Sequence, residues 1–415
     1  MKKQMENRKT YIIGGGVSGL VAARVLENNG FEPIIIEATD RVGGRVKTDV
    51  KKGYQLDHGF QVLLTSYPMA QKYLDLEALD LQRFLPGASI FRSGKQKIIG
   101  DPLRQISFLF PTLFSGIGNG KDKLKIIKLN ALLKRKSIES IFEEKETTTL
   151  DYLGKFGFSQ SIINDFFTPF FSGIFLETAL STSSRMFEFV YKMFGEGNAA
   201  LPKAGIEAIP AQLKQKLTKT TYLFNTKVRE VKNGEIKLEN GEVLQSKSII
   251  VATDPTKLIS NLAGQSTKWK SCVTLYFETE SRNIKKPLIG LVADKESLVN
   301  NIFFHTSLES DSKGKKELLS VTVIDTKGKP ESEIIERVQR ELKQHCGIEA
   351  VEYLAHYHIP LALPDLTNLR YDMLPSETQL TSDIFLAGDT QLNGSLNAAM
   401  VAGERAALAV IEKLR

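Results

Sequence analysis

Hydrophobic residues near the start of the chain are grouped into three short runs. Residues 11–13 form a β-rich run, residues 20–26 have the composition of a helix, and residues 31–36 form a second β-rich run. The asparagine pair that precedes Gly30 is typical of a helix C-terminus. Glu37 follows the third run directly. The pattern predicts a strand, a helix and a second strand that ends at an acidic residue.

Glycines fill the turn between the first strand and the helix. Gly14, Gly16 and Gly19 have the spacing of a dinucleotide-binding turn and lie in the context that this motif requires. They permit, in order, a tight turn, close approach of the backbone to a pyrophosphate, and close packing of the helix on the sheet. Val17 and Ser18 open the helix, whose unpaired N–H groups favour an anion. The turn predicts a dinucleotide cofactor.

The position of Glu37 narrows the choice of cofactor. It lies about 20 positions after the turn, where a carboxylate accepts hydrogen bonds from an adenosine ribose. A carboxylate there disfavours the 2′-phosphate of NADP. The turn and the acid together do not separate NAD from FAD.

A second ligand-binding element is predicted late in the chain. Residues 382–389 form a short apolar run that ends in Gly388 and Asp389, and small residues from Gly394 onward begin a helix. Small side chains on the first turns of a helix let a ligand or a sheet approach closely. An alanine-rich helix that only packs against the core is the alternative interpretation.

Turn signals divide the middle of the chain. The Asn-Gly pair at 233–234 predicts a type I′ hairpin, the pair at 240–241 predicts another turn, and residues 248–253 form a further apolar strand. Two long stretches remain, a helical one at 69–202 and a strand-rich one at 264–377. The strands expected in the second stretch are residues 271–278, 288–292, 318–323 and 350–358.

Composition places the chain among ordinary globular proteins of two or three domains. It has 415 residues, 42% of them hydrophobic, and a formal net charge of +7. Two cysteines are too few for a disulfide framework and favour a reducing compartment. No apolar stretch reaches the length of a signal segment or of a spanning helix. We therefore expect a cytoplasmic protein that binds a small molecule and no nucleic acid.

Four segments resemble one group of flavoproteins. Residues 37–45 resemble the E-A-x-x-R-x-G-G-R signature of the flavin amine oxidase superfamily, which also holds phytoene desaturases and protoporphyrinogen oxidases. Residues 56–61 are similar to its D-x-G segment, residues 201–210 to the start of its second cofactor segment, and residues 402–407 to its closing motif. Ala204 departs from the pattern, because glycine is usual there.

The resemblance implies an α/β fold with FAD as the cofactor. A Rossmann-type FAD-binding domain would be built from three chain segments, 8–68, 203–263 and 378–415. An inserted α+β substrate domain, with helices and a mixed sheet, would comprise residues 69–202 and 264–377.

The resemblance also implies which residues contact FAD. Two arginines would bind the diphosphate, Val228 would meet the adenine, and Asp389 would bind the ribityl chain. The helix that begins at Leu396 would place its N-terminus near the flavin edge that gains negative charge on reduction. The full set is Gly14, Gly16, Val17, Ser18, Gly19, Glu37, Ala38, Arg41, Gly43, Gly44, Arg45, Gly59, Phe60, Val228, Gly388, Asp389, Leu396 and Asn397.

Residues that act on the substrate are harder to assign. His58, Gln61 and Tyr276 are candidates, although a histidine that only anchors its loop by hydrogen bonds is the favoured alternative for His58. Flavin itself would do the chemistry, so no catalytic triad is expected. Residues His305, His345, His356 and His358 form no convincing metal set, and no metal is expected.

One position bears on the type of reaction. Amine oxidases of the superfamily commonly place a lysine, bridged by water to flavin N5, at the start of the strand that resembles residues 273–277. Here Cys272 holds that position, although Lys268 and Lys270 are close enough for the alignment to shift.

Three functional readings stay open. The cysteine favours hydride removal from a carbon of a mostly apolar molecule, as in desaturases and protoporphyrinogen oxidases, with oxygen or a quinone as the electron acceptor. An amine oxidase is the first alternative. A protein that holds FAD for a structural or partner-binding role, without turnover, is the second.

Residues 106–136 combine apolar and basic character. An apolar stretch at 106–114 precedes a lysine-rich segment in which Leu124, Ile127 and Ala131 share one helical face. The region could bind an anionic membrane surface. A solvated basic helix that lies over a core stripe is the alternative.

Overall fold

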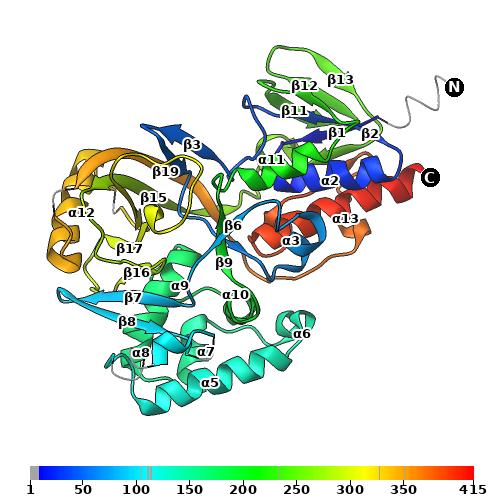
Figure 1. The fold of residues 1–415 in the computed structure, drawn as a ribbon. Helices are drawn as coiled ribbons and strands as arrows, with labels where there is room; N and C mark the ends of the chain where they lie inside the picture. The colour runs from blue at the N-terminus through cyan, green and yellow to red at the C-terminus, as the bar shows by residue number, and fades with distance from the viewer. Residues whose placement is uncertain are drawn as a thin grey trace.

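The computed structural model of the protein describes residues 9–102, 104–109, 112, 115–232, 234–326, 328–349 and 351–415. A small sheet with its helices lies at one end of the molecule (Figure 1). A larger sheet and a helical unit lie at the other end.

A five-stranded parallel sheet gathers three separate parts of the chain. Its strands are β1 (Lys9–Ile13), β2 (Glu32–Ile36), β10 (Thr221–Leu223), β14 (Ile249–Val251) and β20 (Ile384–Leu386). Their order in the sheet is β10-β2-β1-β14-β20, and every neighbouring pair is parallel. The predicted Rossmann-type domain built from three chain segments is therefore confirmed.

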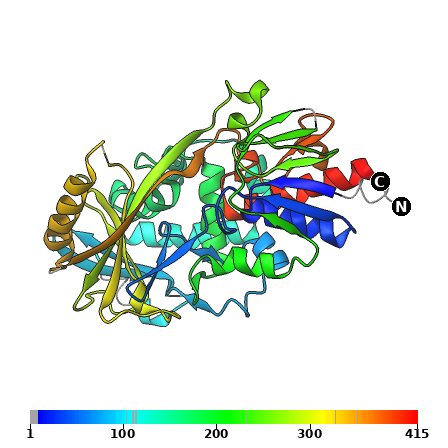
Figure 2. The same ribbon diagram turned by 90° about the horizontal axis from the view of Figure 1, so that it is seen from above.

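Alternating side chains along these strands serve two cores. Ile12 and Ile35 pack with the helices, whereas Ile13 and Ile36 pack under a second, three-stranded sheet. Both faces of a parallel sheet are buried in this way, which explains its continuous hydrophobic runs. The covering helices are α2 (Val17–Asn28), α11 (Ala208–Gln215) and α13 (Leu396–Leu414), and the second sheet comprises β11 (Val228–Lys232), β12 (Glu235–Leu238) and β13 (Val243–Gln245) (Figure 2).

The second sheet contains the predicted hairpin and, at the second predicted turn, a further one. β11 pairs with β12, and β12 pairs with β13, all antiparallel. Gly234 has a φ of +76° and Gly241 a φ of +88°, the left-handed conformation that an Asn-Gly turn requires. Asn233 lies outside the described residues.

Helices α2 and α13 pack with their backbones in close contact. A Cβ atom at Gly403 would lie 2.2 Å from the carbonyl oxygen of Ser18, so the contact requires glycine. α2 follows the carboxyl end of β1, and α13 follows the carboxyl end of β20. Their N-termini therefore lie along the same edge of the parallel sheet, where open α/β sheets bind ligands.

A seven-stranded mixed sheet forms the centre of the second domain. Its order is β19-β15-β18-β17-β16-β7-β8. The strands are β7 (Gly87–Arg92), β8 (Lys95–Gly100), β15 (Lys268–Thr279), β16 (Ile289–Val292), β17 (Val299–Phe304), β18 (Glu317–Val323) and β19 (Glu352–Asp365). Helix α12 (Glu331–Cys346) packs on this sheet through Ile334, Val338 and Leu342.

The expected strands of this domain are present, with two differences. Residues 271–278, 288–292, 318–323 and 350–358 overlap β15, β16, β18 and β19, although residue 350 lies outside the described part. β17 and α12 were not expected. The stretch at 69–202 is not only helical, because its strands β7 and β8 join the sheet through a parallel pairing of β7 with β16.

Helices of the first long stretch form a unit with an aromatic core. Phe167, Phe171 and Phe187 are fully buried at its centre. The helices are α5 (Gly120–Arg135), α6 (Ile138–Glu143), α7 (Thr149–Phe156), α8 (Gln160–Ile162), the π-helical turn η2 (Ile163–Phe167), α9 (Thr168–Phe175) and α10 (Ser184–Glu196). Within the described residues, no helix is both long and apolar enough to cross a membrane.

Small elements connect the two ends of the molecule. A two-stranded sheet comprises β3 (Thr48–Lys51) and β4 (Tyr54–Asp57), and a three-stranded sheet comprises β5 (Leu63–Leu64), β9 (Ala199–Pro202) and β6 (Leu81–Arg83). The short helices are α3 (Pro68–Tyr73), η1 (Ile106–Phe108), η3 (Pro255–Lys257), η4 (Ser260–Leu262), η5 (His305–Ser307), η6 (Pro375–Thr378) and η7 (Asp389–Gln391).

Candidate cofactor site

The glycines of the first turn have different surroundings. Gly14 has a φ of +107°, and a Cβ atom there would lie 2.9 Å from the carbonyl oxygen of Ala252. A Cβ atom at Gly19 would lie 2.1 Å from the carbonyl oxygen of Gly14. At Gly16 the nearest heavy atom would be 4.0 Å away, which leaves room for a ligand against the backbone. Val17 and Ser18 are buried at the start of α2.

Glu37 ties this turn to the end of β2. Its Oε2 atom accepts a hydrogen bond from the backbone N–H of Gly15 at 2.7 Å. Its Oε1 atom accepts from the backbone N–H and the hydroxyl of Thr39, at 2.9 and 2.8 Å. The carboxylate is 7% exposed, and Ala38 beside it is exposed. An acceptor is therefore held at the point predicted for the ribose.

A second glycine loop runs against the first. The backbone N–H of Gly43 donates to the carbonyl oxygen of Gly15 at 2.9 Å, and Gly43 pairs with Gly16 in a β-bridge. Gly44 has a φ of +60°, and a Cβ atom there would lie 3.4 Å from the Cα of Gly16. The two loops are therefore in van der Waals contact, and the positive φ of Gly44 favours glycine there.

Arg45 joins this loop to the last segment of the chain. Its Nη2 atom donates to Oδ1 of Asp389 at 2.5 Å, and the carboxylate is buried. The guanidinium also lies 5.3 Å from the ring centroid of Trp269, at the start of β15. The indole Nε1 atom of Trp269 is buried and has no hydrogen-bond partner among the described residues. No motif of the sequence indicates a role for this residue, which is the chain's single tryptophan.

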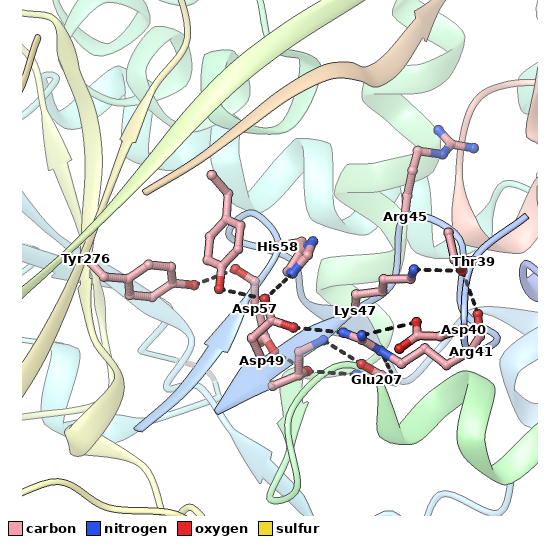
Figure 3. A network of polar contacts seen from close by, with 12 residues as sticks. Thr39, Asp40, Arg41, Arg45, Lys47, Asp49, Asp57, His58, Glu207 and Tyr276 are labelled. Atoms are coloured by element: carbon pink, nitrogen blue, oxygen red, sulfur yellow. Dashed lines mark hydrogen bonds and ion pairs between the residues drawn. The ribbon is translucent and has the colours of Figure 1, made fainter. Parts of the chain in front are cut away.

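Arg41 points in another direction and is already paired. Its Nη2 atom donates to Oδ1 of Asp49 at 2.7 Å, and its Nε atom donates to Oε1 of Glu207 at 2.9 Å (Figure 3). The second oxygen of Glu207 accepts from the backbone N–H of Thr48 at 2.9 Å. In this structure Arg41 thus links two segments of the chain. Its predicted role at the diphosphate stays a prediction.

His58 belongs to the same network. Its Nε2 atom lies 2.8 Å from Oδ2 of Asp49, and its ring stacks on Tyr357 with centroids 4.2 Å apart. The hydroxyl of Tyr357 donates to the same oxygen at 3.0 Å. Burial raises the pKa of Asp49, but hydrogen bonds from His58, Tyr357 and Arg41 outweigh it and hold that pKa below its ordinary value. These contacts fit the loop-anchoring interpretation of His58.

The segment after His58 shapes the floor of the site. Gly59 has a φ of +98°, and a Cβ atom there would lie 3.1 Å from Cδ1 of Ile359. The side-chain N–H groups of Gln61 donate to the carbonyl oxygens of Arg45 and His58, each at 2.9 Å. Gln61 therefore connects this segment to the arginine loop.

Tyr276 and Asp57 lie behind the site. The hydroxyl of Tyr276, which is fully buried, donates to the carbonyl oxygen of Asp57 at 2.8 Å. Burial raises the pKa of the Asp57 carboxyl to about 6, although hydrogen bonds from Thr48 and the Ile206 N–H lower it. Burial also keeps the pKa of Tyr276 well above its ordinary value. Both side chains have the contacts of structural groups.

The last segment supplies a helix N-terminus. Gly388 has a φ of +115°, and the nearest heavy atom to a Cβ there would be 3.8 Å away. Ser395 caps α13 by accepting from the N–H of Ala398 at 3.0 Å, so Leu396 and Asn397 form its first turn. The side-chain oxygen of Asn397 accepts from the N–H of Met69 at 3.1 Å.

Val228 lies at the far end of the site. It is buried in β11, and two hydrogen bonds fix the chain just before it. The N–H groups of Asn225 and Thr226 donate to the carbonyl oxygens of Thr39 and Glu37, at 2.9 and 3.0 Å. The middle segment of the chain is thereby brought beside the predicted ribose acceptor.

The start of β15 carries an exposed lysine, Lys268, and a second lysine, Lys270, that is engaged by neighbouring side chains. Lys270 lies 3.5 Å from a carboxylate oxygen of Asp365 and donates to the Thr182 hydroxyl at 3.3 Å. Cys272 pairs with Ile359 of β19, and burial raises the pKa of its thiol to about 11. The thiol is therefore protonated near neutral pH.

These residues fit an FAD molecule. Open backbone surface lies at Gly16 and Gly388, where a Cβ atom would find nothing closer than 3.8 Å. A buried carboxylate, an arginine and two helix N-termini lie along the same edge of the parallel sheet, and this donor and acceptor set suits a ribose and a diphosphate. Among the described residues, no group of three histidine, cysteine or acidic side chains could hold a metal ion.

Comparison with known proteins gives a consistent result. Residues 17–411 match the model of the family described as flavin containing amine oxidoreductase. A polyamine oxidase of Oryza sativa subsp. japonica is 54% identical over 48 residues, which are 12% of this chain and 10% of that protein. A coproporphyrinogen III oxidase of Bacillus subtilis (strain 168) is 24% identical over 302 residues, 61% of each chain. The matches thus span less than two thirds of either relative.

A solved structure shows the same fold along nearly the whole chain. An oxidoreductase from Methanosarcina mazei superposes with a TM-score of 0.73 at 17% sequence identity. The superposition covers 97% of this chain and 100% of the other. At this identity the similarity concerns the fold alone.

Proposed function

The chain belongs to the flavin-containing amine oxidoreductase family, and from this premise we propose that it removes hydride from a carbon of a mostly apolar organic molecule. Family membership makes it an FAD-dependent oxidoreductase. FAD, when bound, supplies the hydride acceptor, and the protein supplies orientation and electrostatics. The reaction would resemble the oxidation of a substrate by a desaturase or a protoporphyrinogen oxidase.

An uncharged aromatic wall beside Gly59 carries this proposal. The ring of Phe60 lies 5.5 Å from that of Phe303, and Phe303 lies 4.6 Å from Phe84. His305 completes the cluster, 5.1 Å from Phe303. Burial lowers the pKa of His305 to about 4, so its ring is neutral near pH 7. A wall of this kind favours an apolar substrate over a cation.

The environment of β15 supports the same choice. Lys270 is engaged with Asp365 and Thr182, and the Cys272 thiol is protonated at neutral pH. These contacts argue against Lys270 and Cys272 as the counterpart of the lysine that amine oxidases commonly hold near flavin N5, whereas Lys268 is exposed at the start of the strand. The alternative, an amine oxidase, draws support from the short segment shared with the rice polyamine oxidase.

Two features of the chain would stabilise negative charge on a bound cofactor. Arg45 holds its guanidinium beside the two glycine loops through Asp389. The N-terminus of α13 presents backbone N–H groups and the positive end of the helix dipole. Positive charge at these two points would favour transfer of hydride from an uncharged substrate to the cofactor.

The proposal is tested by anaerobic mixing of the yellow holoprotein with three substrate classes. Porphyrinogens come first, because the sequence match to the coproporphyrinogen III oxidase is longer than that to the polyamine oxidase. Carotenoid precursors and amines follow. Bleaching of the oxidised-flavin band by either apolar class, and not by amines, is the expected result. Bleaching by amines alone would make the chain an amine oxidase.

Two further outcomes are distinguishable in the same assay. If dithionite reduces the flavin and no candidate substrate does, the protein holds FAD without turnover. Reoxidation of the reduced protein by oxygen or by a quinone identifies the electron acceptor.

A variant pair tests the aromatic wall itself. Phe84→Ala removes a half-buried ring of the wall and should raise KM for the apolar substrate more than it lowers kcat. Phe224→Ala is the matched control, because that ring stacks on Tyr222 at 5.4 Å in the cofactor domain. If the two substitutions changed KM equally, the aromatic wall would not be part of the substrate-binding site.

A further inference from the structure

Helix α5 exposes a face that is both apolar and basic. Leu124 is 69% exposed and Ile127 is 53% exposed, and Ala131 lies between them on the same side of the helix. The periodicity of the sequence predicts that these residues share one helical face, and in the structure this face is exposed to solvent. Leu124 and Ile127 therefore do not belong to the core stripe of the helix. Leu129 and Leu133, which are almost fully buried, pack in the core instead.

Basic side chains surround this apolar stripe. Lys121, Lys128, Lys134 and Arg135 occupy the same outward side, at helical spacings of three, four and seven residues from the stripe. None of the four forms an ion pair with any residue that the structure describes, and the ammonium group of Lys128 lies 5.8 Å from the ring centroid of Phe156. The one acidic residue of α5, Asp122, is buried, where it completes the N-terminal capping box with Asn119. The exposed face thus carries positive charge without compensation from its own helix.

The inner side of α5 is firmly held. The Nζ atom of Lys192 donates to the carbonyl oxygen of Leu133 at 2.9 Å. Lys136, just after the helix, forms ion pairs with Glu188 of α10 at 2.5 Å and with Glu144 at 2.6 Å. The outward face is therefore presented by a rigid element. α5 lies at the lower edge of the molecule, away from the parallel sheet (Figure 1).

We propose that this face of α5 binds the surface of an anionic lipid bilayer. A helix with apolar side chains along its exposed centre and lysines on both flanks is suited to lie at the boundary of head groups and acyl chains. The lysines and Arg135 meet anionic head groups, while Leu124 and Ile127 enter the interface. This inference is independent of the substrate proposed above.

Charge argues against a second copy of the chain as the occupant. A two-fold interface brings the same patch of both copies together, so the uncompensated lysines of one would face those of the other. A purely phosphate-bearing partner would leave Leu124 and Ile127 without a role. An anionic bilayer satisfies both halves of the surface.

Vesicle flotation with the holoprotein tests the proposal. We expect it to float with vesicles of phosphatidylcholine and phosphatidylglycerol at low salt, and to float poorly with phosphatidylcholine alone. Raising the salt to 1 M should reduce binding severalfold, because the Debye length then falls to about 3 Å. Absence of flotation with the anionic vesicles at low salt would overturn the proposal.

Two variants of α5 separate the apolar contribution from the charge. Leu124→Ser with Ile127→Ser should weaken partitioning at both salt concentrations. Lys128→Gln with Lys134→Gln should weaken it at low salt by roughly tenfold or more, since each basic residue near an anionic surface contributes about fivefold. The four side chains are exposed, so flavin content and melting temperature should remain those of the wild type.

A matched control lies in the cofactor domain. The control variant combines Val243→Ser with Lys232→Gln. Val243 is 47% exposed on β13, and Lys232 is exposed on β11. This variant should float as the wild type does. Equal loss of flotation in the control and the α5 variants would contradict a specific surface. So would a change in sedimentation of the α5 variants without lipid, because it would identify a second copy as the occupant.

Discussion

Gly16 and Gly19 lie three positions apart in one turn, yet a methyl group would have opposite consequences at the two. At Gly19 the added Cβ would lie 2.1 Å from a backbone oxygen that cannot move freely. We expect Gly19→Ala to destabilise the fold by roughly 1–3 kcal/mol, as overpacking of a tight contact does. A lower melting temperature of the flavin-free protein is the measurement that checks it.

Gly16→Ala is the matched substitution. Its φ of −74° suits alanine, and the nearest heavy atom would be 4.0 Å away, so the protein should fold normally. The methyl group would occupy the open surface predicted to meet the pyrophosphate. We therefore expect weaker FAD binding at unchanged stability of the flavin-free form, measured by flavin titration. If the dissociation constant for FAD were unaltered, Gly16 would not contact the cofactor.

Asp57 predicts a dependence of stability on pH. Its pKa is raised to about 6 in the folded protein, above the ordinary value of 3.8. Well below pH 3.8 the carboxyl is protonated in both states. As pH rises towards 6 the unfolded chain releases its proton first, so this group lowers the stability of the fold by up to about 3 kcal/mol.

Replacing the carboxyl tests this prediction. Asp57→Asn keeps an oxygen that can accept from Thr48 and from the N–H of Ile206. The melting temperature of the variant should rise relative to the wild type between pH 4 and pH 6 and stay level above that. A difference that is constant with pH would mean that Asp57 does not titrate in this range.

Single residues also show where a motif stops being informative. The sequence marks Arg41 and Arg45 alike as diphosphate donors. Arg45 does lie beside the glycine loops, whereas Arg41 is held by Asp49 and Glu207. Glu207 is 166 positions away in the chain, and no local pattern indicates such a partner. A motif identifies the type of group, and tertiary contacts decide its direction.

At the scale of elements, the contact between α2 and α13 predicts a second stability effect. Gly403→Ala would place a methyl group 2.2 Å from the Ser18 carbonyl and force the two helices apart. We expect a lower melting temperature and a weaker hold on FAD, because both helices begin at the cofactor site. Gly195→Ala in α10 is the control, since a Cβ atom there would meet nothing within 4 Å.

The control should move stability in the other direction. Alanine in a helix restricts the unfolded chain more than glycine does, so Gly195→Ala should stabilise the protein by up to about 1 kcal/mol. If both substitutions lowered the melting temperature equally, the effect of Gly403→Ala would not come from the helix contact.

Elements differ in how far the sequence predicts them. The β1–α2–β2 unit and the first hairpin of the second sheet were predicted because their turns and runs are local. β7 was missed, because it pairs with β16 about 200 positions further along the chain, and that pairing leaves no local signal. The periodicity of α5 grouped Leu124 with Ile127, but only the packing of Leu129 and Leu133 shows that the group faces outward.

At the scale of the whole molecule, the predicted cofactor site joins three distant segments of the chain, so we expect the fold to depend on FAD. Any ligand that binds only the folded state stabilises it, by about 2.7 kcal/mol at a hundredfold excess over the dissociation constant. We expect the holoprotein to melt at a higher temperature than the flavin-free protein and to resist proteolysis around Arg45 and Asp389. Equal melting temperatures would contradict a site that ties the segments together.

The placement of β20 at the edge of the parallel sheet has a consequence for synthesis of the protein. The Arg45–Asp389 pair and the start of α13 require residues that the ribosome adds late. At 5–20 residues per second, roughly 20–70 s separate translation of Glu37 from that of Asp389. During that interval the glycine turn exists without the groups that complete its pocket. Flavin therefore has a finished site to enter only after β20 and the start of α13 have been translated, and a ribosome stalled before β20 would carry a colourless chain.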